Sequence, residues 1–190
     1  MPDYEYQKRI PIAPTTMETI IKNHGYYDIN SNWNSIVQVV GYEGLLFRGR
    51  VEVIVIKDHS MYMTLQTRGK DTPYRIPGGS LEKSVSNIDQ ARKEVLEEAK
   101  MYIKNLRYTG ENYVRVHSRQ RTKNPSKKVS WDGHYTEIFV AEYDRDYKGH
   151  IKESVYDHDM YSTGKFYDIN EIHTILIPEH RKVLQRLHLI

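Results

Sequence analysis

Three glutamates, Glu94, Glu97 and Glu98, are spaced so that one short stretch of helix would bring their carboxylates to one side. At about 100° per residue, positions i, i+3 and i+4 share one sector of a helix. Like charges placed in this way repel each other, so a cation is expected between them. Oxygen-only ligands suit hard ions such as Mg²⁺ or Mn²⁺, which bridge phosphate oxygens and activate water. The spacing is thus one that a divalent-cation site for phosphate chemistry requires, and by itself it does not separate such a site from an ordinary solvated helix face.

A Pro-Gly-Gly turn precedes this acidic stretch. Gly78 and Gly79 follow Pro77 and allow backbone carbonyls and amides to approach a metal or a phosphate closely. Each feature also has an ordinary explanation, because acidic helix faces are commonly just solvated and Pro-Gly-Gly is commonly a plain turn. The combination of the two features favours a metal and phosphate site.

The three glutamates share one side only if they lie on a helix, and the residues just before them predict where that helix begins. Ser86 predicts an N-cap, and Asp89 in the first turn suits the positive end of the helix dipole. The predicted helix runs from there to about Lys100, with the glutamates along the rim of its buried face. The apolar stripe of that face is predicted from Ile88, Ala91, Val95 and Ala99.

The run from Gly79 to Met101 resembles the box of the Nudix hydrolase (MutT-like) family. That box reads Gly, five residues, Glu, seven residues, Arg-Glu, an aliphatic residue, any residue, Glu-Glu, any residue, Gly and an aliphatic residue. The register is kept without gaps, and the matching positions are Gly79, Glu94, Val95, Glu97, Glu98 and Met101. Three positions depart from the pattern: Val85 replaces the first Glu, Lys93 replaces Arg and Lys100 replaces the final Gly.

The resemblance implies a catalytic centre. Glu94, Glu97 and Glu98 would be the catalytic residues, and together with the Gly78 carbonyl they would bind Mg²⁺ or Mn²⁺. The general base is either Glu94 or an acid in a later loop. The candidates in that loop are Glu153, Asp157 and Asp159. Because Val85 and Lys93 remove a bracing pair of the family, we hypothesise that Glu82 pairs with Lys93 instead.

The resemblance also implies a substrate class, a small-molecule nucleotide. A nucleoside diphosphate linked to another moiety, of ADP-ribose or nucleotide-sugar type, is favoured over a nucleoside triphosphate. Arg75, Gly79, Arg119 and Arg121 are predicted to bind the substrate. Two alternatives remain: a catalytically weakened module that senses a nucleotide or RNA, and a structural domain that uses its first 49 residues for dimer contacts.

Further elements complete the predicted fold, an α/β/α sandwich around a mixed sheet of the Nudix type. A hairpin is predicted from Val51–Ile56 and Met61–Thr67, and a last helix from Glu179 to Leu187 after Pro178. The other predicted strands are Asn112–His117, Tyr135–Tyr143 and Lys165–Ile169. Residues 1–49 are interpreted as an accessory segment with a strand and a short helix, Thr16–Gly25, and residues 50–190 as the Nudix domain.

The composition excludes several classes of protein. The chain of 190 residues has no cysteine, which rules out disulfides and thiolate metal sites, and its net charge of +3 is too small to favour nucleic acid as the partner. The apolar runs are too short to span a bilayer. We therefore expect a cytoplasmic protein without a membrane partner, and a homodimer stays open.

Overall fold

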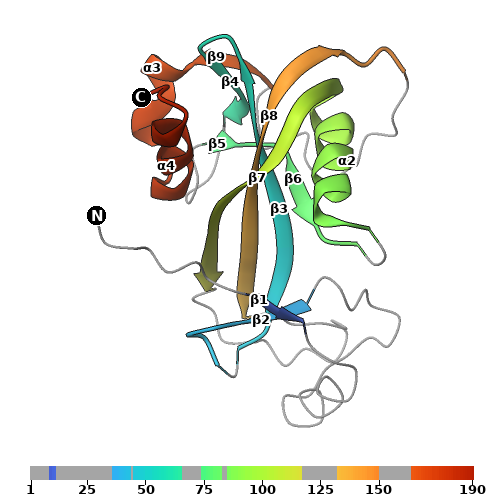
Figure 1. The fold of residues 1–190 in the computed structure, drawn as a ribbon, viewed down its shortest axis with the longest axis vertical. Helices are drawn as coiled ribbons and strands as arrows, with labels where there is room; N and C mark the ends of the chain where they lie inside the picture. The colour runs from blue at the N-terminus through green and yellow to red at the C-terminus, as the bar shows by residue number, and fades with distance from the viewer. Residues whose placement is uncertain are drawn as a thin grey trace. The chain divides into compact units, whose positions relative to one another are not determined.

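The computed structural model describes residues 9–11, 36–43, 45–65, 74–82, 85–116, 132–149 and 164–190. Along these ranges six strands come before the first described helix, and three further strands lie between that helix and the C-terminal helices (Figure 1). The strands are β1 (Arg9–Pro11), β2 (Ile36–Val39), β3 (Phe47–Lys57), β4 (Ser60–Leu65), β5 (Tyr74–Arg75), β6 (Gly78–Ser80), β7 (Met101–Val116), β8 (Gly133–Asp146) and β9 (Lys165–Asp168). The helices are α2 (Asn87–Ala99), α3 (Ile169–Ile172), the 3-10 turn η2 (His173–Ile175) and α4 (Pro178–Arg186).

Strand β3 organises the sheet of the described residues. It pairs with β2, β4, β6 and β8, while β7 pairs with β8 and β9 pairs with β4. The hairpin of β3 and β4 is antiparallel, with Ile56 opposite Met61, which confirms the predicted hairpin. Because β6 also pairs with β3, the Gly78–Gly79 bend is held directly by this strand.

The chain divides into two compact units. The first contains described residues from 1–50, 80–85 and 112–137, and its core consists of Val37, Val39, Phe47 and Tyr135. Tyr42 packs edge-on against Phe47, with ring centroids 5.6 Å apart. The second unit contains residues from 51–79, 86–111 and 138–190, and it holds all of the described helices. The division into residues 1–49 and 50–190 stays a prediction.

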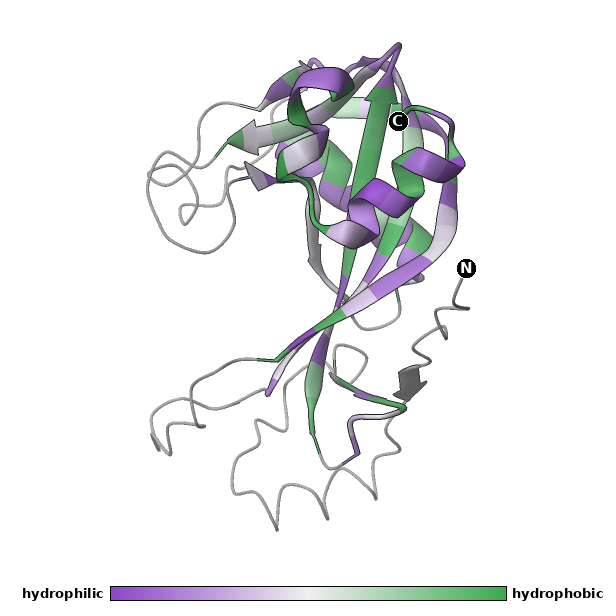
Figure 2. Ribbon diagram, turned by 90° about the vertical axis from the view of Figure 1, so that its left-hand side faces the viewer, coloured by the Kyte–Doolittle hydropathy of each residue, from purple (hydrophilic) through white to green (hydrophobic). Residues whose placement is uncertain are grey.

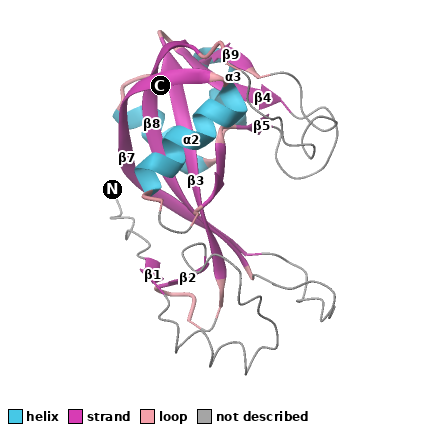
Figure 3. Ribbon diagram, turned by 90° about the vertical axis from the view of Figure 1, so that its right-hand side faces the viewer, coloured by secondary structure: helices cyan, strands magenta, loops and turns pink. Residues whose placement is uncertain are grey.

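The second unit is a sandwich of strands and helices. Helix α2 lies on one side of its strands, and α3 and α4 lie on the other (Figures 1 and 3). Some strands are mostly hydrophobic and others mostly hydrophilic, whereas the helices alternate between hydrophilic and hydrophobic residues (Figure 2). Fully buried side chains from both layers, such as Val53, Ile138 and Leu184, form the core. The predicted α/β sandwich around a mixed sheet is confirmed.

Helix α2 begins where the sequence predicts. The Ser86 hydroxyl accepts a hydrogen bond from the Asp89 amide at 3.1 Å, which satisfies one of the free amides of the first turn. The predicted apolar stripe is wrong at one end, because Ile88 is exposed and Gln90 is fully buried. The buried face thus includes Glu94 itself, which lies inside that face and not on its rim.

The end of α2 keeps the geometry of a glycine stop without the glycine. Lys100 has φ 52° and ψ 47°, in the left-handed region, and its amide donates to the Leu96 carbonyl at 3.2 Å. A residue with a Cβ is strained in this conformation, which is why glycine is common there. Lysine in place of glycine at this position therefore raises the free energy of the turn without changing its backbone conformation.

Replacing Lys100 by glycine is expected to stabilise the protein by about 0.5–1 kcal/mol, because glycine adopts positive φ without steric cost. The urea concentration at the unfolding midpoint should rise. The slope of the unfolding free energy against urea concentration should stay unchanged. Lys104→Gly is the matched control: this exposed lysine lies in the interior of β7, where glycine weakens a strand. A lower midpoint for Lys100→Gly would contradict the strain argument.

Strand β7 is much longer than the predicted strand at Asn112–His117, since it starts at Met101 directly after the turn. Asn105 and Gly110 interrupt it with φ of 54° and 80°. Such positions are typical of bulges, and they disturb the alternation of polar and apolar residues by which strands are recognised. Strand β8 likewise extends past the predicted end at Tyr143 to Asp146.

The C-terminal elements agree with the predicted order. Strand β9 ends at Asp168, whose carboxylate accepts from the Asn170 amide at 2.8 Å and caps α3, a helix that the sequence did not indicate. Pro178 begins α4, as predicted, and Val183 and Leu184 are its buried residues together with His180. The predicted helix Thr16–Gly25 lies outside the described residues. Within the described part of the chain, no helix is long and apolar enough to cross a membrane.

Candidate active site

The Gly78–Gly79 bend is packed too tightly for any side chain at Gly78. A Cβ there would overlap the Val51 carbonyl oxygen and lie 2.9 Å from Cγ of Glu52. The Val53 amide donates to the Pro77 carbonyl at 2.8 Å, which ties the bend to β3. Glycine is therefore required at Gly78 for the backbone of β6 to reach β3.

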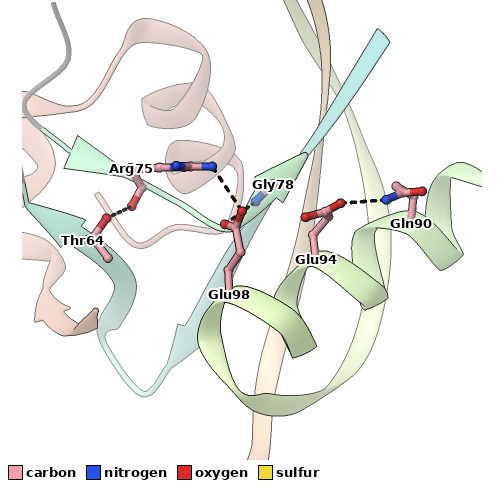
Figure 4. A network of polar contacts seen from close by, with 6 residues as sticks. All are labelled: Thr64, Arg75, Gly78, Gln90, Glu94 and Glu98. Carbon is pink, nitrogen blue, oxygen red and sulfur yellow. Dashed lines mark hydrogen bonds and ion pairs between the residues drawn. The ribbon is translucent and has the colours of Figure 1, made fainter. Parts of the chain in front are cut away.

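Glu94 occupies the space that Gly79 leaves free. A Cβ on Gly79 would overlap the Glu94 carboxylate, with Oε2 at 2.6 Å. The carboxylate is buried, and its Oε1 accepts a hydrogen bond from Nε2 of Gln90 at 2.7 Å (Figure 4). Since a buried carboxylate is costly without donors, the Gln90 amide both compensates and orients it. The glycine and the glutamine together hold Glu94 against the bend.

Glu98 lies one helical turn further along and contacts the same bend. Its Oε2 accepts from the Gly78 amide at 3.2 Å, and its Oε1 accepts from Nη2 of Arg75 at 3.2 Å. Figure 4 shows Glu94 and Glu98 projecting from α2 toward β6, with Arg75 approaching Glu98 from the strand side. Arg75, which was predicted to bind substrate, thus places a positive charge beside the carboxylate of Glu98.

Glu97 projects from a different sector of α2 than the other two glutamates. On a helix it lies about 60° from Glu94 and about 100° from Glu98, whereas Glu94 and Glu98 are only about 40° apart. Its Oε1 lies 3.9 Å from Nζ of Lys93, and both side chains are exposed. Among the described residues, no three His, Cys, Asp or Glu side chains gather closely enough to hold a metal ion. The role of Glu97 as a metal ligand stays a prediction.

Tyr62 extends the site onto β4. Burial raises the pKa of its hydroxyl, and the negative charge of Glu98 raises it further. The ring packs edge-on against Phe166, with centroids 5.5 Å apart. Tyr62 therefore keeps its proton at neutral pH and presents a hydroxyl within the electrostatic field of Glu98. The sequence did not single it out.

Several predicted residues cannot be placed. The substrate-binding candidates Arg119 and Arg121, and the candidate bases Glu153, Asp157 and Asp159, lie outside the described residues. The pairing of Glu82 with Lys93 stays a prediction. Gln90 was missed, although its position four residues before Glu94 is a recognisable spacing for a side-chain hydrogen bond on a helix.

Comparison with solved structures identifies the fold. A NUDIX hydrolase from Nitrosomonas europaea superposes with a TM-score of 0.52 at 17% identity, covering 74% of this chain and 87% of that one. A MutT NUDIX hydrolase from Burkholderia pseudomallei gives a TM-score of 0.51 at 11% identity, covering 74% and 97%. The chain has the Nudix fold. Neither a family model nor a curated protein sequence matches it.

The Nudix fold explains why the glycine bend and α2 adjoin. In this chain the bend pairs with β3, and α2 lies beside the bend (Figure 4). The resemblance noted in the run from Gly79 to Met101 thus extends to the fold of the unit that carries it. Because sequence identity to these structures is low, they establish the architecture, and the chemistry has to be argued from the residues of this chain.

Proposed function

We propose that this protein is a metal-dependent pyrophosphohydrolase of the Nudix type. Its substrate is a nucleoside diphosphate linked to another moiety, of ADP-ribose or nucleotide-sugar type, or a nucleoside triphosphate. The observation that carries the proposal is that Glu94 and Glu98 both lie against the Gly78–Gly79 bend, with Glu94 filling the space of an absent Cβ. A solvated acidic helix face would not require such a close fit.

The residues at the bend fit a hard divalent cation. The donors available there are carboxylate oxygens, which Mg²⁺ and Mn²⁺ prefer over nitrogen or sulfur ligands. Glu94 and Glu98 would hold the ion, with Glu97 and the Gly78 carbonyl as the further ligands implied by the resemblance. When bound, such an ion supplies Lewis acidity toward phosphate oxygens and lowers the pKa of water.

The residues of the chain itself orient the reaction. Gln90 holds the Glu94 carboxylate, which is the candidate base on α2, by a hydrogen bond to Oε1, and both carboxylate oxygens lie beside Gly79. Arg75 offers a planar guanidinium that suits phosphate oxygens and already lies at the edge of the site. We assign Arg75 and the Gly79 backbone to the substrate. Arg119, Arg121 and the loop acids Glu153, Asp157 and Asp159 remain candidates for the same site.

One observation favours the alternative of a nucleotide or RNA sensor without turnover. Lys93 stands where the Nudix pattern has Arg, and its ammonium group lies near Glu97. If that contact persists, Glu97 is less available to a metal ion, and binding without hydrolysis would result. The proposal of an enzyme is favoured because Glu94 and Glu98 are both directed at the bend.

Turnover is expected when the protein is incubated with ADP-ribose, a nucleotide sugar and nucleoside triphosphates in the presence of Mg²⁺ or Mn²⁺, because the carboxylates require the ion to act on a diphosphate. Liquid chromatography would detect the mononucleotide products. EDTA should abolish the reaction, and excess Mn²⁺ should restore it. Metal-independent binding of nucleotide or a short RNA without any product would instead establish the sensor.

We place this reaction in the cytoplasm and expect a small-molecule substrate, with nucleic acid not favoured. Light scattering of the purified protein would decide whether it forms the homodimer that the first 49 residues are proposed to support.

A further inference from the structure

A buried chain of hydrogen bonds lies beside the glycine bend. Tyr74 of β5 and His180 of α4 are each 3% exposed, and the side chain of Glu52 on β3 is 14% exposed. The Tyr74 hydroxyl lies 2.6 Å from Nδ1 of His180, and Nε2 of His180 lies 2.9 Å from Oε2 of Glu52. The three residues are far apart in the sequence and meet only in the folded chain. We call this arrangement the Tyr74–His180–Glu52 relay.

The partners of the relay define the direction of each hydrogen bond. The Ile177 amide, at the N-cap of α4, donates to the Tyr74 oxygen at 3.0 Å. We therefore assign the Tyr74 proton to the bond with Nδ1 of His180, and the imidazole proton to Nε2, from which it is donated to Glu52. In this assignment every contact has one donor and one acceptor, so the relay joins α4, β5 and β3 without a conflict.

Both ends of the relay reach the segment that forms the bend. Tyr74 directly precedes Arg75, which binds Glu98. At the other end, Cγ of Glu52 lies so close to Gly78 that a Cβ on Gly78 would be 2.9 Å away. The Gly78 amide also binds Glu98. The two groups that hold Glu98 thus come from a segment whose ends are both fixed by the relay.

We propose that Tyr74, His180 and Glu52 are positioning residues that hold Arg75 and the Gly78 amide against Glu98. None of the three contacts the carboxylates of α2 through the bonds described, so they act through the backbone of the bend. The relay also links the position of the bend to that of α4. His180 lies in the first turn of α4, and Ile177 is its N-cap residue. That this positioning serves catalysis rests on the proposed function; the positioning itself does not.

Removing the Tyr74 hydroxyl tests the relay while keeping the ring. Tyr74→Phe deprives the Ile177 amide of its acceptor and His180 of its donor. The matched control is Val183→Ala, which loosens the packing of α4 at a buried position without removing a relay group. Each variant, like the wild type, is measured at the same number of degrees below its own unfolding midpoint. A general loss of stability then affects all three samples equally.

The first readout is hydrogen exchange of the Gly78 amide, followed by NMR in the metal-free protein. Exchange in Tyr74→Phe is expected to be about tenfold faster than in Val183→Ala, because local opening of the bend becomes easier. Equal exchange in the two variants would overturn the proposal. This readout requires neither metal nor substrate, so it decides the relay even if the wild type shows no hydrolysis and the proposed function fails.

The second readout is Mn²⁺ affinity and turnover. Loss of a group that orients a ligand typically costs about 10–100-fold, and we expect a loss in that range for Tyr74→Phe and little change for Val183→Ala. Glu52→Gln keeps an oxygen that accepts from Nε2 of His180 and should retain most of the protection at Gly78, whereas Glu52→Leu should not. If Tyr74→Phe does not fold, the two Glu52 variants decide the question, and equal exchange in them would refute the relay.

Discussion

Replacing Glu98 by glutamine is expected to lower the turnover of the phosphoanhydride substrate by about a thousandfold while leaving the fold intact. The amide oxygen of glutamine still accepts from Arg75 or the Gly78 amide, so the bend keeps a partner. The negative charge that would hold the divalent ion is lost, however, and the Lewis acidity at stake amounts to several kcal/mol, with about 1.4 kcal/mol for each factor of ten. Steady-state kinetics with saturating Mn²⁺ would measure the loss.

The same substitution at Glu171, an exposed residue of α3, is the matched control and should leave turnover unchanged. The unfolding midpoint of Glu98→Gln should stay close to that of the wild type, since ion pairs that are partly exposed contribute about 0–1 kcal/mol. Glu97→Gln tests separately whether Glu97 is a metal ligand or only a partner of Lys93. A loss as large as that of Glu98→Gln would assign Glu97 to the metal despite its contact with Lys93. A Glu98→Gln variant with full activity would refute the proposed site.

Gly79→Ala is expected to abolish most activity while the protein stays folded. The three atoms nearest the added Cβ all belong to the Glu94 carboxylate, which is the far end of a flexible side chain. Glu94 would move away and lose its hydrogen bond from Gln90, at a cost of about 1 kcal/mol in stability. A displacement of about 1 Å in a catalytic group can reduce turnover by about a hundredfold. Kinetics together with urea unfolding would separate the two effects.

Gly78→Ala provides the contrast from the neighbouring position. Its Cβ would meet the Val51 carbonyl oxygen, which is backbone of a central strand and has little freedom to move. We expect destabilisation of about 3 kcal/mol or more, with activity lost because the bend is lost. If both variants were equally destabilised, or if Gly79→Ala remained fully active, the close fit of Glu94 against Gly79 would not be the basis of the site.

Local signals in the sequence were sufficient for the catalytic helix. Ser86 and the spacing of Glu94 and Glu98 determine where α2 begins and which side the two carboxylates share, and both features act within a few residues. The turn after the helix was not anticipated in detail. Its left-handed Lys100 follows from the chain reversing directly into β7, which a lysine permits only at a steric cost.

Features that depend on contacts between distant segments could not be predicted from the sequence. Strand β7 was recognised only in its last residues because Asn105 and Gly110 interrupt its alternation. The burial of Gln90 in place of Ile88 depends on which side of α2 meets the strands, and a helical pattern with several polar residues leaves that choice open. Tyr62 was missed because its link to Glu98 depends on β4 lying near the end of α2.

The sequence by itself determined a glycine bend followed by a capped helix with correctly spaced carboxylates, together with the hairpin before them and the last helix after them. Only the tertiary structure decided that Glu94 and Glu98 reach the bend, and that Tyr74, His180 and Glu52 meet behind it. The physical reason is one of range. Caps and helical spacing act between neighbouring residues, whereas close packing against glycine and buried hydrogen bonds depend on segments that only the complete fold brings together.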